Sequence, residues 1–165
     1  MERLALFSGR NQVDPASGIF PPTGAQDRER LSAVSAEDRD RMMFCLEFCG
    51  AVLERRPCHI EALALAAGCY TELGFFADGL KADRMLLSLR PGDPLVLYNL
   101  ACSFSLNALP DEALAALAEA VENGYADFRH MEQDQDLAAL HPDPRFKAML
   151  HALLEKSLRS PRPSA

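Results

Sequence analysis

Cysteine and histidine residues near the first long predicted helix could form a metal site. Cys45 and Cys49 lie one helical turn apart, and Cys58 and His59 follow them shortly afterwards. Thiolate and imidazole ligands of this kind bind Zn²⁺ in proteins. However, Cys45 and Cys49 both fall on the apolar stripe of that helix, and the chain has no Cys-x-x-Cys pair. We therefore interpret these thiols as small core residues and predict no metal site.

A run of carboxylates in the C-terminal third superficially resembles an acidic calcium loop. Its members are Glu132, Asp134, Asp136 and Asp143. The run lacks the central glycine and the terminal glutamate that an EF-hand loop uses to wrap and bind Ca²⁺. We expect these residues to form the solvated end of a helix.

The histidines could in principle activate a serine or cysteine nucleophile. They are His59, His130, His141 and His151. However, the chain contains no phosphate-binding glycine loop, no nucleophile elbow and no His-Glu-x-x-His pair. We predict that the protein is not an enzyme, with no catalytic residues and no cofactor.

The composition of the chain argues against nucleic acid and membranes as partners and favours the cytoplasm as the compartment. The 165 residues suit a single domain, and 17 basic against 24 acidic residues give a net charge of −7, which disfavours nucleic acid. No stretch approaches the roughly 20 apolar residues that span a bilayer, and Glu2 interrupts the short apolar start, so we expect neither a membrane partner nor a signal peptide. The five cysteines form no close-set disulfide framework, which favours the cytoplasm.

The pattern along the chain predicts an all-α fold. Residues 1–34, rich in proline and glycine up to residue 24, are predicted to be an extended or flexible N-terminal arm, although the charged residues 25–34 could instead form a short helix. A helical domain is predicted over 35–158, with a flexible tail at 159–165. Apolar spacing and stop signals predict about seven helices. The first six span about 36–56, 59–73, 76–89, 94–107, 110–123 and 127–139, and the last lies between the break at 141–144 and the tail.

Residues 60–93 and 94–127 repeat one helix-pair pattern with a period of 34. Superposing the two stretches pairs large residues with large and small with small, as expected when one packing unit is used twice. The pairs include Leu63 with Leu97, Ala67 with Ala101, Tyr70 with Phe104, Gly74 with Ala108, and Gly79 with Ala113.

These positions resemble the tetratricopeptide repeat (TPR), a 34-residue helix pair that stacks into an α-solenoid. The resemblance is carried by Leu63, Ala67, Tyr70, Gly74 and Gly79 and by their equivalents in the second unit. The helix at 36–56 resembles the second helix of a preceding unit whose first helix is missing, and residues 126–150 resemble an atypical closing segment. The resemblance implies a TPR-like solenoid of about three helix pairs plus a flanking helix.

The resemblance also implies a binding site, because such arrays hold a peptide or a helix on the face lined by the first helix of each pair. Carried over, the groove positions are Glu61, Ala64, Gly68, Thr71, Glu72, Leu95, Tyr98, Asn99, Cys102, Ser105 and Leu106. This lining suits a segment with apolar anchors and a Lys or Arg. The cationic residues that clamp a C-terminal carboxylate in some family members are absent here. Tyr98 has a second interpretation, in which it covers the next helix pair.

We therefore predict a cytoplasmic adaptor or scaffold that binds another protein through this groove. One alternative is a chaperone that resembles the TPR chaperones of type III secretion. Another is a regulatory or assembly subunit of a larger enzyme. A homodimer through the N-terminal arm or the first helix also stays open.

Overall fold

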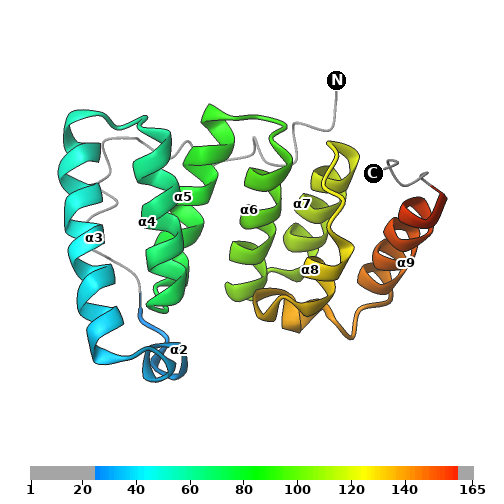
Figure 1. Ribbon diagram of the computed structural model, residues 1–165, viewed down its shortest axis with the longest axis horizontal. Coiled ribbons are helices and arrows are strands. Elements are labelled where there is room, and N and C mark those ends of the chain that lie inside the picture. The colour runs from blue at the N-terminus through cyan, green and yellow to red at the C-terminus, as the bar shows by residue number, and fades with distance from the viewer. Residues whose placement is uncertain (1–24, 160–165) are drawn as a thin grey trace, which may run out of the picture.

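A computed structural model describes residues 25–159, which form a row of helices that pack against their neighbours in sequence (Figure 1). The helices are α2 (Arg28–Ala33), α3 (Ala36–Arg55), α4 (Ile60–Glu72), α5 (Phe76–Leu89), α6 (Pro94–Leu106), α7 (Pro110–Glu122), α8 (Phe128–Gln133), the 3₁₀ helix η1 (Gln135–Leu140) and α9 (Pro144–Arg159). No strand occurs in this part of the chain, so the predicted all-α class is confirmed.

Three helices begin with the same kind of cap, spaced 34 residues apart. His59, Asp93 and Asp127 precede α4, α6 and α8, and each accepts a hydrogen bond from a backbone N–H in the first turn. The donors are the amides of Ala62 at 3.3 Å, Leu95 and Val96 at 3.0 and 3.3 Å, and His130 at 3.0 Å. Such caps satisfy otherwise unpaired amides, so each fixes where its helix starts. The 34-residue spacing therefore extends to a third helix start.

The turns inside the two central helix pairs also match. Gly74 and Ala108 have φ of 77° and 57°, the left-handed region that reverses the chain after α4 and α6. The next residue closes each turn, with Phe75 N donating to Tyr70 O at 2.8 Å and Leu109 N to Phe104 O at 3.0 Å. A Cβ on Gly74 would lie 2.7 Å from the Asp27 carbonyl oxygen, which explains glycine there.

The buried sides of α4 and α6 combine large and small residues in the same order. Leu63, Leu97 and Tyr70 are fully buried, and Phe104 is 2% exposed. Ala67 and Ala101 sit between them at 5% and 0% exposure, where a larger side chain would push the helices apart. One cluster of buried residues joins α3, α4 and α5, and a second, which includes Leu80 of α5, joins α6 to α9. Because α5 contributes to both clusters, it joins the two halves.

A buried acidic residue also lies at the α5–α6 contact. Asp83 is 4% exposed and accepts a hydrogen bond from the Ser103 hydroxyl at 2.5 Å. Burial raises the pKa of this carboxyl to about 6, and the bond from Ser103 opposes the rise. A second polar contact joins the same two helices, because Asn107 Nδ2 at the end of α6 donates to Phe76 O of α5 at 2.9 Å.

The predicted helix bounds hold to within one or two residues, except at the sixth helix. The stretch predicted as one helix over 127–139 is divided at Asp134, which is extended at ψ 117° and caps η1 by accepting from Asp136 N at 2.9 Å. Within 25–34, the charged residues form the short helix α2 rather than an arm. Residues 1–24 and 160–165, which make up the rest of the predicted arm and most of the predicted tail, lie outside the described residues.

None of the helices described between residues 25 and 159 has the length and apolarity that crossing a membrane requires.

Candidate functional site

The eleven predicted groove residues divide into an accessible set and a buried set. The exposed residues are Glu61, Ala64, Gly68, Glu72, Leu95 and Asn99; Thr71 and Leu106 are half-buried; Tyr98, Cys102 and Ser105 are buried. On α4 the exposed residues recur every three or four positions and share one side of the helix. On α6 the exposed part is confined to the first turns, at Leu95 and Asn99.

Tyr98 is buried because the segment that follows α7 lies over it. Its hydroxyl donates to Asp134 Oδ2 at 2.6 Å, and its ring stacks on Tyr125 with a centroid separation of 4.3 Å and an interplanar angle of 5°. The His130 ring is tilted against the Tyr98 ring at a centroid separation of 5.4 Å. Tyr98 is consequently only 2% exposed. This placement matches the second interpretation of Tyr98, as a residue that covers the next helix pair.

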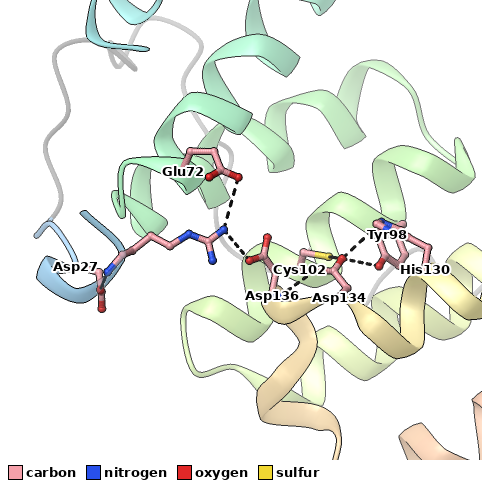
Figure 2. A network of polar contacts seen from close by, with 8 residues as sticks. Asp27, Glu72, Tyr98, Cys102, His130, Asp134 and Asp136 are labelled. Carbon is pink, nitrogen blue, oxygen red and sulfur yellow. Dashed lines mark hydrogen bonds and ion pairs between the residues drawn. The ribbon is translucent and has the colours of Figure 1, made fainter. Parts of the chain in front are cut away.

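Cys102 lies one turn further along α6 and contacts the same carboxylate. Its thiol donates to Asp134 Oδ2 at 3.5 Å, as Figure 2 shows. Burial raises the pKa of Cys102, and the nearby charges of Asp134 and Asp136 raise it further. The thiol therefore stays protonated at neutral pH, and a protonated buried thiol is a poor nucleophile.

Ser105 is buried with its hydroxyl unpaired among the described residues.

A second polar contact joins α2, near the start of the described residues, to α4 and η1. The Arg30 guanidinium of α2 lies 3.0 Å from Asp136 Oδ1 of η1 and 3.6 Å from Glu72 Oε1 at the end of α4 (Figure 2). Burial raises the pKa of Asp136, while the charge of Arg30 acts to lower it. Arg30 therefore offsets only part of the desolvation of this half-buried carboxylate.

The residues before α2 fix its position against the α4–α5 turn. Asp27 N donates to Gly74 O at 2.8 Å, and Gln26 Nε2 donates to Leu73 O at 3.0 Å. Asp27 also caps α2 by accepting from Arg30 N at 2.8 Å. The arginine is thus held at the C-terminal end of α4, where Glu72 lies.

The candidate site consists of the accessible predicted residues of α4 and of the first turns of α6, which the contacts of Asp134 and Arg30 bound towards the C-terminal ends of these helices. Its accessible residues are Glu61, Ala64, Gly68, Glu72, Leu95 and Asn99, with Leu65 beside them at 47% exposure and Leu95 at 60%. Both leucines are apolar side chains that face solvent, and the two glutamates give the α4 side a negative charge. We call this set the α4–α6 face.

Sequence reasoning missed the three residues that close this face, Arg30, Asp134 and Asp136. The two aspartates were predicted to lie on a solvated helix end, but their side chains are only 15% and 19% exposed. The Asp134-x-Asp136 spacing was an available signal. An aspartate side chain can accept a hydrogen bond from the backbone N–H two residues later, and this local bond competes with the continuation of a helix. Arg30 carried no such signal, since its partners lie far away in the sequence, at Glu72 and Asp136.

The residues considered as metal ligands do not assemble into a site. Within residues 25–159, no three or more His, Cys, Asp or Glu side chains are grouped so as to bind a metal ion. Cys49 is buried in the core, Cys58 is exposed in the turn after α3, and His59 caps α4. At the second candidate site, Asp143 is occupied by Arg145, whose Nη2 lies 2.8 Å from Asp143 Oδ2.

Comparison with known proteins gives a partial match. No family model matches the chain, and no solved structure matches it. Over 84 residues the chain is 29% identical to a chloroplastic protein of Arabidopsis thaliana. The alignment covers 49% of this chain and 25% of that protein, so the chain spans about a quarter of the relative it matches.

Proposed function

We propose that this chain is a non-enzymatic protein-interaction module of the tetratricopeptide type. In this proposal it acts as an adaptor or scaffold and binds a peptide or helix of a partner protein on the α4–α6 face. The 34-residue spacing of the caps at His59, Asp93 and Asp127 supports the family assignment, as do the matching left-handed turns at Gly74 and Ala108. All five cysteines are free thiols, which supports a reducing compartment such as the cytoplasm.

The main support for the proposal is that the small residues Ala64 and Gly68, which we call the strip on α4, lie on the same face as exposed leucines. Ala64 and Gly68 project little side chain, and a Cβ added at Gly68 would meet nothing within 4 Å. Leu65 and Leu95 are exposed where a partner's apolar residues could pack. Solvent-facing apolar residues around a shallow strip are typical of a surface that binds another chain.

The charge of the face indicates the kind of partner segment. Glu61 and Glu72 lie near opposite ends of the strip on α4, and the protein as a whole carries a net charge of −7. Glu72 is 53% exposed and lies 3.6 Å from Arg30. Glu61 lies 3.3 Å from His59 Nδ1 but is 77% exposed, so it is the more available carboxylate. A partner segment with a Lys or Arg near an apolar anchor therefore complements this face. Such pairing sets orientation and association rate more than affinity.

A blocking substitution at Gly68 tests the proposal. Gly68→Arg fills the strip and adds a positive charge to it, yet the open space around the position lets the helix form as before. Ala148→Arg, at an exposed position on α9, is the matched control. A partner captured from the native host is purified, and its affinity for each variant is measured by titration calorimetry.

We expect Gly68→Arg to weaken this affinity by at least about tenfold, equivalent to about 1.4 kcal/mol, and Ala148→Arg to leave it unchanged. Equal affinities for the two variants would place the binding surface elsewhere on the molecule and refute the assignment to the α4–α6 face.

A further inference from the structure

The side of α3 that faces away from the rest of the array carries two exposed phenylalanines. Phe44 is 71% exposed and Phe48 is 60% exposed, and they lie one helical turn apart. Residues on the same side of the helix recur at intervals of three and four. This α3 outer face consists of Glu37, Arg41, Phe44, Phe48, Ala51 and Arg55, all of them exposed.

The opposite side of α3 already has its packing partner. Leu46, Cys49 and Gly50 are buried there, in the cluster that α3 shares with α4 and α5. Helix α5 packs against both α4 and α6, whereas the principal contact of α3 within residues 25–159 is with α4. Helix α3 thus stands at the end of the row (Figure 1), with an apolar patch facing outward.

The two charged ends of the α3 outer face, Glu37 and Arg55, are equidistant from its centre, whereas Arg41 has Ala51 as its counterpart and is already paired with Asp38 of its own helix at 2.7 Å. Phe44 and Phe48 lie two residues on either side of Leu46, and Glu37 and Arg55 lie nine residues on either side of it. If a second α3 packs antiparallel across this centre, Glu37 meets Arg55 at both ends, and Phe44 lies beside Phe48. A parallel arrangement would instead align Glu37 with Glu37 and Arg55 with Arg55, and like charges repel.

We propose that the α3 outer face binds a second copy of this chain in an antiparallel, two-fold arrangement. An isologous contact requires a surface that is complementary to itself, and this face meets that requirement in both its apolar centre and its charged ends. A single helix pair buries less than the standard interface of about 1,600 Å², so the dimer should dissociate on dilution. The proposal is independent of the α4–α6 face.

Charge reversal at the two ends tests this arrangement with the full-length protein. The variants are Glu37→Arg, Arg55→Glu, their combination, and Phe44→Ser with Phe48→Ser. Leu158→Ser, which removes another exposed apolar side chain (77% exposed, on α9), is the control. Sedimentation equilibrium gives the dimer dissociation constant, and circular dichroism melts verify that each variant is folded.

We expect each single charge reversal to raise the dissociation constant by about tenfold or more, and an equimolar mixture of the two singly reversed proteins to form a heterodimer. The combined E37R/R55E protein should dimerise like the wild type, the two phenylalanine substitutions should abolish the dimer, and Leu158→Ser should have no effect.

Three results would overturn the proposal. The first is a full-length protein that stays monomeric up to several hundred micromolar. The second is a dimer that survives loss of both phenylalanines. The third is a monomer that dimerises only after residues 1–24 are deleted, because that segment would then be the occupant of the face.

Discussion

Replacing Asp83 by asparagine should change how the stability of this protein depends on pH. Asp83 is 4% exposed, and its carboxylate accepts a hydrogen bond from the Ser103 hydroxyl. Burial favours the neutral form of a carboxyl group, and the single hydrogen bond from Ser103 offsets only part of this effect. Asparagine has almost the same shape and can still accept the bond from Ser103, but it carries no charge at any pH.

The size of the effect follows from the pKa of this group. Burial raises the pKa of Asp83 from its ordinary 3.8 to about 6. The folded protein therefore binds this proton more tightly than the unfolded chain does, and folding takes up a proton between these two values. Stability from this group is consequently lost as the pH rises from about 4 to about 6, and the total loss is about 3 kcal/mol at about 1.36 kcal/mol per pKa unit.

Urea unfolding of the wild type and Asp83→Asn across this range measures the difference directly, because all other titrating groups are common to both proteins. At low pH the variant should be less stable by about 1–3 kcal/mol, since its amide N–H₂ is buried without an acceptor. At neutral pH the variant should recover by about 3 kcal/mol relative to the wild type and match or exceed it. Glu112→Gln, which removes an exposed carboxylate from α7, is the control for net charge.

A difference in unfolding free energy between Asp83→Asn and wild type that stays constant from about pH 4 to pH 7 would refute the argument. It would mean that Asp83 ionises in the folded protein as it does in the unfolded chain.

Two further tests probe the packing and the closing segment. Gly68→Ala should stabilise the protein by about 0.5–1 kcal/mol, because alanine favours the helix and its Cβ meets nothing within 4 Å. Gly79→Ala should gain less or lose stability, because its Cβ would lie 3.1 Å from Thr71 Oγ1; thermal melts that rank the two variants the other way would contradict this. Tyr98→Phe should lower the unfolding free energy by about 1–3 kcal/mol through loss of the bond to Asp134, with faster amide exchange in residues 128–140. Unchanged exchange there would mean that Tyr98 does not hold this segment in place.

The sequence was sufficient where structure depends on neighbours within one or two turns. The bounds of α4, α5, α6 and α7 follow from apolar spacing and from local signals such as the Asp93–Pro94 pair, which caps and begins α6. Buried equivalents such as Leu63 and Leu97 follow from the 34-residue period. Helix caps are local signals, and the buried equivalents appear once in each of the two repeats, so both kinds of feature can be recognised in a single sequence.

The candidate site was harder to predict because its accessibility depends on long-range contacts. Nothing near Tyr98 in sequence indicates that a carboxylate 36 residues later accepts a hydrogen bond from its hydroxyl. The same holds for Arg30, whose partners Glu72 and Asp136 come from two other helices. A periodic pattern predicts which side of a helix faces the groove, but it does not predict whether a later segment covers that side.

The covering segment also limits what the α4–α6 face can bind. Asp134 holds the middle of α6 through Tyr98 and Cys102, and Arg30 joins Glu72 to Asp136 where α4 ends. A partner that lies on the proposed face therefore meets these contacts if it extends towards the C-terminal ends of α4 and α6. The open part is the N-terminal two or three turns of each helix, about 12–15 Å at about 1.5 Å per residue. That length suits a short apolar anchor with one basic residue better than a long extended peptide.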